Sequence, residues 1–570
     1  MQRLLPGTQE SCLGFKPELT LCVTIVAMLL ARLPSWGWKV NARYIALPGV
    51  LVALYFAAPW LNLMGQPDDL LKATGRREIF DGMLVYDHWT VYFRSVLLLF
   101  AALFVIFTSL SGIPDREDSP DFYTLVLGGT LGMCVMASAN HLLTVFLGVE
   151  MASVPSYALA GILKGRRKSS EAALKYSVYG AGTSGVMLYG ISLLAGALGT
   201  CHLPTMAVQL ALLAPEALAE RQVVLLFGGL FVMVGLAFKL SAVPFHFWCP
   251  DVFEGASAEV NAFLSVASKA AALALLVRVA IGFSYVPAAA SEPSAGENAA
   301  ADLPAGAQAH LVGYRAALHA GHDDGGADDE ASKTVAGNAS LAPVRRYAVG
   351  LISLLAAITC TFGNLTAYAQ TNIKRLLAYS TIAHAGYMMM PVAAAVALAG
   401  DRPHDAQNAL ASLAFYVGVY LFMNLGAFAV VAFLRNAMHS EEIADYAGLI
   451  RRCPGVAIWF SVILISLIGL PPLAGFAAKF LAFGALMDAK LYALLVIGGL
   501  NTALSLFYYL RVVRLMTIDP EREDRLPFKL PVLSPAGIFL VLVSLPVVVL
   551  GVFFDEFNLW ALAAAQHVLL

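Results

Sequence analysis

The strongest constraint on this chain is a succession of long apolar runs, each close to the length that crosses a bilayer. A membrane-spanning helix needs roughly 20 predominantly apolar residues. We therefore expect an all-α polytopic membrane protein with about fourteen transmembrane helices. The expected spans are 18–33, 43–63, 89–112, 121–139, 141–163, 172–198, 223–248, 257–286, 346–368, 373–399, 407–434, 455–486, 489–516 and 532–554.

The composition excludes several other classes of protein. Hydrophobic residues make up 59% of the 570 residues and charged residues only 13%, whereas soluble proteins carry roughly 25% charged residues. The 36 Lys and Arg are balanced by 38 Asp and Glu, so the basic face of a nucleic-acid binder is missing. The seven cysteines form no CxxC pair and have no metal-ligand spacing. We expect no metal site and no iron–sulfur cluster in this chain.

The loops between the spans indicate the orientation of the chain. Cytoplasmic loops carry an excess of Lys and Arg, and the larger share falls on the cytoplasmic side if the N-terminus lies outside. We therefore expect both termini on the outer, periplasmic side of a cell inner membrane. The stretch 287–345 is rich in Ala, Gly and Asp and has too few large apolar residues for a core. We expect a flexible insertion on the outer face, with a small partner-binding element as the alternative.

Proline interrupts two of the spans. Pro244 lies near the end of 223–248, and Pro471 and Pro472 lie in the middle of 455–486. Proline removes a backbone donor and frees the carbonyl four residues before it. In a membrane, such breaks are tolerated where they are buried in protein or line a polar cavity. Since the breaks are five spans apart, we expect two inverted five-helix repeats, spans 4–8 and 9–13, an arrangement typical of transporters.

These patterns divide the chain into five parts. The expected parts are the first three helices at 1–120, the first repeat at 121–286, the loop insertion at 287–345, the second repeat at 346–516, and a loop with the last helix at 517–570.

The chemistry is expected at ionisable residues inside the spans, namely Glu150, Lys239, Lys269 and Lys479. Each costs roughly 2.5–3.5 kcal/mol to place at the centre of a membrane. A static buried ion pair is the simpler explanation, but one glutamate does not neutralise three lysines. Burial favours the neutral form of a lysine and a nearby carboxylate favours the charged form. A lysine whose carboxylate partner moves therefore exchanges protons, so the set predicts proton carriage.

Three further polar residues have two interpretations each. Lys175 lies near the start of 172–198, where it either extends to the headgroups or joins the buried set. His384 and His246 are either part of a relay or neutral rings bonded to a helix carbonyl, and for His246 we favour the second role.

Three cations near span ends are expected to lie at the membrane interface. Lys374 and Arg375 begin a span and are expected to anchor the helix at the interface. Arg278 lies near the outer end of 257–286, where it is expected to extend to the headgroups.

The stretches around these residues identify a family. They are FKLSAVPFHFWCPDVFEGA at 238–256, SVASKAAALALLVR at 265–278, NIKRLLAYSTIAHAGYMMM at 372–390 and GLPPLAGFAAKF at 469–480. With them the chain resembles the antiporter-like membrane subunits of NADH–quinone oxidoreductase (respiratory complex I). Subunits L and M and Mrp-type antiporter subunits share the core, but WCPDVFEGA and SKAAA are more similar to the subunit N group.

The resemblance implies a role for each of the buried ionisable residues. Glu150 matches the glutamate of helix five, Lys239 the lysine of broken helix seven and Lys269 the helix-eight lysine that links two half-channels. Lys479 matches the helix-twelve lysine near the exit, and Lys175 and His384 resemble further residues of the polar axis. The loop 287–345 is longer than the family implies.

The same resemblance implies a proton-translocating subunit of a translocase. Quinone reduction in partner subunits would drive protons from the cytoplasm to the outer side. NAD(H), FMN, iron–sulfur clusters and quinone would belong to those partners, with no redox centre or cofactor in this chain. The implied partners are the other membrane and peripheral subunits and the lipid bilayer.

Three alternatives remain open at this point. A subunit of a Mrp-type cation/proton antiporter, or of another redox-driven relative, needs the same lysines. A scaffold subunit that no longer pumps does not need all four buried ionisable residues. A solute carrier predicts a substrate-sized polar pocket, whereas these polar groups are scattered singly over several helices.

Overall fold

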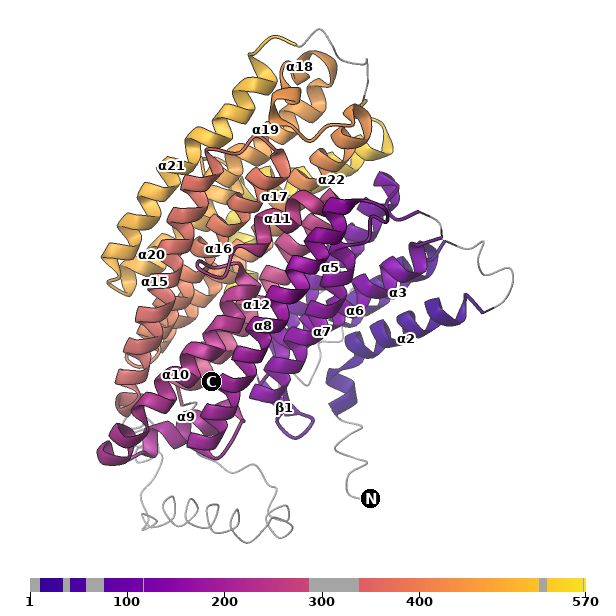
Figure 1. Ribbon diagram of the computed structural model, residues 1–570. Coiled ribbons are helices and arrows are strands. Elements are labelled where there is room, and N and C mark those ends of the chain that lie inside the picture. Colours follow the sequence, from indigo (N-terminus) through magenta and orange to yellow (C-terminus); the bar gives the residue numbers. More distant parts are fainter. Residues whose placement is uncertain are drawn as a thin grey trace.

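Helices make up nearly all of the described chain (Figure 1). The computed structural model describes residues 11–33, 41–57, 76–115, 117–286, 338–521, 530–566 and 568–569. Up to residue 286 the elements are α2 (Lys16–Leu30), α3 (Arg43–Ala57), β1 (Arg76–Ile79), β2 (Leu84–Asp87), α5 (His88–Ser111), α6 (Ser119–Ser138), α7 (Leu142–Ala160), α8 (Arg167–Leu198), α9 (Leu203–Leu212), α10 (Pro215–Leu240), α11 (Trp248–Gly255) and α12 (Ala258–Ser284). From residue 338 they are α15 (Ala342–Ala367), α16 (Ile373–Leu398), α17 (Pro403–Met438), η5 (Ile443–Tyr446), α18 (Leu449–Arg452), α19 (Pro454–Ile468), α20 (Ala474–Asp488), α21 (Tyr492–Thr517), α22 (Pro535–Val552) and α23 (Phe554–Ala565).

The chain is a polytopic helical membrane protein, as its apolar runs predict. Eleven helices of the described residues are long and apolar enough to cross a membrane. The helices α2, α3, α19 and α20 have 15 residues each, which is roughly 22 Å at 1.5 Å per residue and less than the hydrocarbon core of about 30 Å. The count of fourteen spans therefore stays a prediction.

Burial separates central from peripheral helices. In α12 an apolar stretch of 18 residues is entirely buried inside the protein, and in α16 and α17 the corresponding stretch is 94% buried. In α8, α21 and α22 only 33% of the corresponding stretch is buried. The peripheral helices expose leucine, valine and phenylalanine side chains, as expected of surfaces that face lipid. Polar residues on α12, α16 and α17 are thus enclosed by protein.

The exception to the helical architecture among the described residues is a short antiparallel hairpin of β1 and β2, in which Arg76 pairs with Asp87. The Asp87 carboxylate accepts from Thr90 N at the start of α5 and binds Arg278 Nη1 and Nη2 of α12 at 2.6 and 2.5 Å. Burial raises the pKa of Asp87, but the Arg278 charge and hydrogen bonds lower it more, to about 2. The expectation that Arg278 extends to the headgroups is wrong, because its side chain is buried in this pair.

The two spans predicted to be interrupted by proline are broken at those prolines. Helix α10 ends at Leu240, and its C-cap Ser241 has a left-handed backbone with φ of 56°. The chain then turns through Pro244 into α11. Helix α19 ends at Ile468, followed by Gly469 with φ of 90°, a conformation that glycine adopts without strain. The chain then passes Pro471 and Pro472 before α20 begins.

Isolated strand bridges occur at corresponding places in the two halves of the chain. His141, between α6 and α7, pairs with His202 after α8. Asn372, between α15 and α16, pairs with Glu442 after α17. The first bridge lies on the side of the β-hairpin, and the second lies at the opposite ends of the helices, where η5 and α18 are found (Figure 1). This placement supports inverted repeats, whose exact extent stays a prediction.

The described ends of the chain lie on one side of the bundle, which we call the hairpin side. Gln407 near the start of α17 donates to the Gln566 carbonyl. Asn338 bonds both the N–H and the carbonyl of Val286, so both ends of the long insertion meet there. Residues 287–337 of that insertion lie outside the described residues. Helix α15 starts at Ala342, four residues before the expected span.

Candidate functional site

Lys269 binds a backbone carbonyl that Pro244 leaves free. In a continuous helix the Leu240 carbonyl accepts from the N–H of residue 244, but proline has no N–H. The Nζ of Lys269, on α12, donates to this carbonyl at 2.7 Å. The Lys269 side chain is only 1% exposed. The break in α10 therefore builds a receptor for one lysine ammonium.

Lys479 binds the carbonyls that the second break leaves free. Pro471 and Pro472 deprive the carbonyls of Leu467 and Ile468 of their helical donors. The Nζ of Lys479 lies 3.3 Å from the first and 2.9 Å from the second. It also lies 4.3 Å from the centre of the Tyr387 ring. The same device thus occurs in both halves of the chain.

The two lysines lie at the negative ends of half-helices. The C-terminus of a helix carries roughly half a negative charge, and α10 and α19 both end inside the bundle. The ends of such broken helices bind cations and protons in many transporters. This negative potential opposes the desolvation that makes a buried ammonium costly. Lys269 and Lys479 are therefore placed to hold a proton without a neighbouring carboxylate.

Lys239 lies beside the first of these sites but makes different contacts. It is in the last turn of α10, next to Leu240, and is 3% exposed. Its Nζ lies 5.6 Å from the ring centre of Tyr157 and 5.9 Å from that of Tyr176. Its charge interacts with that of Glu150, although no ion pair within 4.0 Å joins these two described residues. Lys239 is thus held by aromatic rings and a more distant carboxylate.

Glu150 differs from its predicted environment. It lies on α7, is only half-buried, and accepts a hydrogen bond from Ser184 Oγ of α8. It is not the lone buried acid that the sequence suggests. Among the described residues, three carboxylates other than Glu150 are fully buried and each is paired with an arginine; the pairs are Glu18–Arg94, Asp87–Arg278 and Glu259–Arg435. Glu150 is distinguished by having no arginine partner among the described residues.

His384 lies in a buried polar cluster of the second half. Its Nδ1 is 2.9 Å from Tyr416 Oη and its Nε2 is 3.4 Å from Tyr509 Oη. Its ring centre is 5.9 Å from that of Tyr387, the ring that Lys479 covers. Lys479 and His384 thus both contact the ring of Tyr387. No hydrogen bond joins His384 to Lys269 among the described residues, although α12 and α16 pack together.

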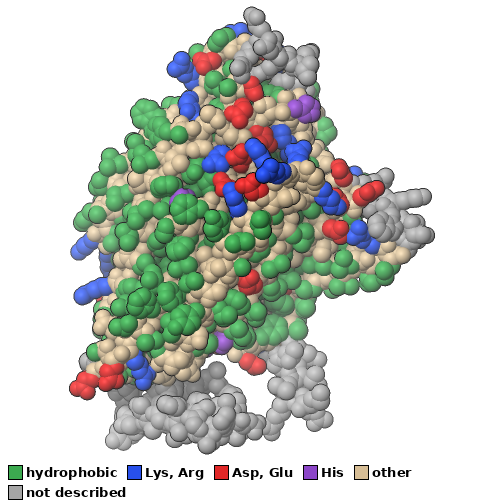
Figure 2. Space-filling model, viewed as in Figure 1, with side chains coloured by type: hydrophobic (Ala, Val, Ile, Leu, Met, Phe, Trp, Pro, Cys, Tyr) green, Lys and Arg blue, Asp and Glu red, His purple; other side chains and the backbone are tan. Residues whose placement is uncertain are grey.

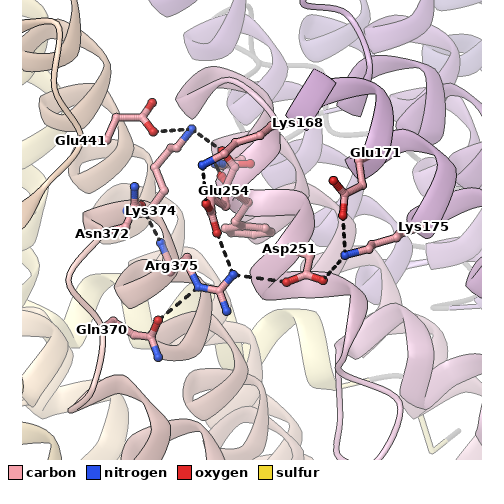
Figure 3. A network of polar contacts seen from close by, with 12 residues as sticks. Lys168, Glu171, Lys175, Asp251, Glu254, Gln370, Asn372, Lys374, Arg375 and Glu441 are labelled. Carbon is pink, nitrogen blue, oxygen red and sulfur yellow. Dashed lines mark hydrogen bonds and ion pairs between the residues drawn. The ribbon is translucent and has the colours of Figure 1, made fainter. Parts of the chain in front are cut away.

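Lys175 belongs to an ion network (Figure 3) that includes α11, which lies away from the β-hairpin (Figure 1). Its Nζ binds Asp251 of α11 at 2.7 Å and Glu171 at 2.9 Å. The same network joins Lys168 to Glu254 and Arg375 to Asp251 and Glu254. Charged side chains gather in the upper part of the face in Figure 2, above an area of mostly apolar side chains. The structure thus separates Lys175 from the buried lysines.

Lys374 is buried rather than anchored at the interface, so that expectation is wrong. It is 3% exposed, and its Nζ donates to the carbonyls of Glu254 and Ala256 at 2.9 Å each. It also pairs with Glu441 at 2.8 Å. The burial of Lys374 could not be predicted from its place at the start of a span. The carbonyls that it binds come from the end of α11, more than a hundred residues earlier.

The His246 ring interacts with the backbone carbonyl of Pro244, which is consistent with the structural role expected of it. Its Nδ1 is buried without a hydrogen-bond partner in the described chain. The ring packs against Phe247 and Phe362, with ring centres at 4.4 and 4.5 Å. The described residues also hold no group of three His, Cys, Asp or Glu side chains able to bind a metal ion.

Residues 139–291 and 339–505, more than half of the chain, match the family described as NADH:quinone oxidoreductase/Mrp antiporter, TM. The chain belongs to this family. The match includes all four predicted relay residues and both breaks. The resemblance seen in the four sequence stretches is thereby confirmed.

The relatives of this chain include subunit N proteins, and the alignments cover nearly the whole length of both proteins. The chain is 37% identical to NADH-quinone oxidoreductase subunit N of Anaeromyxobacter sp. (strain Fw109-5), over 99% of each chain. It is 38% identical to subunit N 2 of Sorangium cellulosum (strain So ce56), over 95% of this chain and 94% of that one.

Solved structures share the fold of this family member. One chain of respiratory complex I from Thermus thermophilus with bound aureothin has a TM-score of 0.66 and 29% identity, over 95% of this chain and 98% of that one. A chain of the Mrp complex from Dietzia sp. DQ12-45-1b has a TM-score of 0.71 at 18% identity, over 99% and 98%. The second likeness shows the fold alone.

Proposed function

We propose that this chain is a proton-translocating membrane subunit of an NADH–quinone oxidoreductase. The supporting observation is that Lys269 and Lys479 bind the carbonyls freed by the two proline breaks. A proton-carrying ammonium needs a buried acceptor on which it can rest, and each half-helix end provides one. The membership of the family and the subunit N relatives support the same conclusion.

The proposed path follows the buried lysines. A proton from the cytoplasm reaches Lys239, whose charge state is set by Glu150. It passes to Lys269, whose carbonyl acceptor belongs to Leu240, the residue next to Lys239. It then crosses to the cluster of His384 and Lys479 and leaves on the outer side. Lys175 belongs to the charged network at the cytoplasmic end of this path.

Orientation and energy supply belong to the same proposal. The hairpin side, with both described ends of the chain, is the outer, periplasmic side of an inner membrane. Many lysines and arginines of the opposite side lie in the ion network of Figure 3, which fits the excess expected of a cytoplasmic face. The driving force comes from quinone reduction in partner subunits, which hold NAD(H), FMN and the iron–sulfur clusters.

Two substitutions test this path in the assembled complex. Lys239→Ala and Glu150→Ala should each abolish or sharply reduce proton pumping during quinone reduction, measured with a pH-sensitive dye in proteoliposomes. Lys490→Ala, at an exposed loop residue, is the control and should pump normally. Full pumping by both relay variants contradicts the assigned roles. Isolation of the chain with peripheral redox subunits distinguishes this function from that of a Mrp-type antiporter subunit, which works without them.

A further inference from the structure

The tip of the β-hairpin has an uncommon backbone conformation. Phe80, Asp81 and Gly82 have φ angles of 53°, 54° and 79°, so three successive residues are left-handed. Glycine adopts this conformation readily, but for a bulky residue such as phenylalanine it is rare and costly. Backbone of this kind persists where the surrounding contacts hold it in place. The stability of the hairpin tip therefore depends on the side chains that bind it.

One of these side chains is the buried amide of Asn140, between α6 and α7. Its Nδ2 donates to the Gly82 carbonyl at 3.3 Å and to Glu78 Oε1 at 2.9 Å. The same Nδ2 lies 2.9 Å from Nε2 of His202, the residue before α9. Arg76 Nη2 donates to Asn140 Oδ1 at 3.3 Å, which orients the amide with its nitrogen towards these acceptors. A single amide thus joins the hairpin to the start of α9.

The protonation state of His202 decides whether all of these acceptors are satisfied. An amide nitrogen carries two hydrogens, but with a neutral ring it faces three acceptors, namely His202 Nε2, Glu78 Oε1 and the Gly82 carbonyl. In that state the ring donates from Nδ1 to Thr205 Oγ1, 2.8 Å away. A protonated ring carries a hydrogen on both nitrogens. Its Nε2 then donates to Glu78 Oε1, 3.1 Å away, and both amide hydrogens remain for Glu78 and Gly82.

The ring and its carboxylate partner are in contact with water. The side chains of His202 and Glu78 are 24% and 42% exposed, at the end of the bundle where the hairpin lies (Figure 1). Histidine is the side chain that ordinarily titrates between about pH 5 and 8. Burial raises the pKa of Glu78, but its hydrogen bonds to His202 and Asn140 and the nearby charges lower it more. Glu78 therefore stays ionised while a histidine titrates.

Glu78 is the one carboxylate that pairs with this ring among the described residues. The other charged or titratable groups around the ring are Arg76 of β1, His141 at the start of α7 and Arg278 of α12. Each of them is a base, so none competes with Glu78 for a protonated ring. The charge of His202 therefore acts on the hairpin through Glu78.

We propose that His202 is a pH sensor that tightens the hairpin tip when the water on the hairpin side becomes acidic. On taking up a proton, the ring stops accepting from Asn140 and donates to Glu78, and the released amide hydrogen binds the Gly82 carbonyl. The bond between ring and carboxylate is present below the pH at which the histidine titrates and is lost as the pH rises through it. It is also lost at much lower pH, where Glu78 itself is protonated.

The sensor does not depend on proton translocation by this chain. Under the proposed function, however, the hairpin side is the side on which protons are released. The hairpin would then respond to the acidity that pumping builds up.

Hydrogen exchange of the hairpin amides in the intact complex tests the sensor. Protection of residues 79–84 is compared at about pH 5.5 and about pH 7.5, on either side of the ordinary histidine value, after correction for the intrinsic pH dependence of exchange. Protection should be roughly three- to tenfold higher at the lower pH, as expected of one charged hydrogen bond that is partly exposed. Peptides of η5 and α18, at the opposite ends of the helices, should not change. Equal protection of the hairpin at both pH values overturns the proposal.

Four variants identify the group that titrates. His202→Gln and Glu78→Gln keep a polar side chain but remove the ion pair, so each should abolish the pH response. His404→Gln is the matched control and should keep the response, because His404 is exposed near the start of α17 and bonded to Asn408. His141→Asn retains a side chain able to cap α7 and should also keep it.

A pH response that survives in His202→Gln, or that disappears in His141→Asn, overturns the assignment to His202. Since exchange is measured without pumping, this result and a failure of the proposed function are distinguishable.

Discussion

At both broken helices a lysine binds the backbone carbonyls that proline leaves free, but the lysine comes from a different place in each half. In the first half, the freed carbonyl of Leu240 is bound by Lys269 from a neighbouring helix. The lysine of the broken helix itself, Lys239, is left to aromatic rings and the charge of Glu150. In the second half, Lys479 lies on the broken helix and binds both freed carbonyls.

The difference indicates how each half controls a proton. Around its break the first half has two buried lysines, Lys239 and Lys269, and the half-buried Glu150, so under the proposed function the charge state of Lys239 depends on a group near the surface of the bundle. The second half has one lysine at its break, Lys479, which lies near tyrosines and His384, while its other buried lysine, Lys374, pairs with Glu441. The Lys479 ammonium is held by two helix carbonyls and the Tyr387 ring, all of which are uncharged. Under the proposed function, the first half is therefore suited to gating and the second to holding and release.

The largest expected effect is a difference in stability between variants of the two lysines that bind carbonyls. Lys479→Met leaves two buried carbonyls without a donor, whereas Lys269→Met leaves one. Each unpaired buried group costs about 1–3 kcal/mol, and the gain from removing a buried charge is common to both variants. Lys479→Met should therefore lower the stability of the complex by about 1–3 kcal/mol more than Lys269→Met. Thermal unfolding of the purified complex measures this difference in stability. Equal stabilities of the two variants would contradict the claim that Lys479 pairs two carbonyls and Lys269 one.

A smaller effect is expected from the aromatic rings. The Lys479 ammonium lies 4.3 Å from the Tyr387 ring centre, whereas that of Lys239 lies 5.6 Å from Tyr157. Tyr387→Leu should lower pumping by roughly two- to fivefold, and Tyr157→Leu by less. Tyr387→Phe keeps the ring and separates its effect from that of the hydroxyl. Pumping rates at matched quinone turnover decide the order, and a larger loss in Tyr157→Leu reverses the comparison.

The smallest effect is expected at the hydrogen bond to Glu150. Ser184→Ala removes the hydroxyl that donates to this carboxylate, but Glu150 is half-buried, so water can replace the donor. We expect a loss of pumping of roughly twofold. Ser177→Ala, two turns earlier on α8 and bonded only to Leu174 of its own helix, is the control. A loss as large as that of Glu150→Ala would assign Ser184 a far greater role than this geometry supports.

The sequence was sufficient to predict the burial of the lysines near the breaks. It was not sufficient to predict the burial of the charged residues near span ends. Lys239, Lys269 and Lys479 lie far from both ends of long apolar runs, where a charge has no route to water, so their burial follows from position alone. Arg278 and Lys374 lie near span ends, where extension to the headgroups is the simpler expectation. Their burial depends on Asp87 and on the end of α11, which no local pattern reveals.

The chain by itself determines which carbonyls are free, because a missing N–H is a covalent property of Pro244, Pro471 and Pro472 and acts four residues back. Only the tertiary structure decides which donor replaces it. Lys479 is 11 residues from the Ile468 carbonyl, but Lys269 is 29 residues from that of Leu240, and Arg278 is 191 residues from Asp87. A hydrogen bond requires approach within about 3 Å, and packing between distant helices alone provides it.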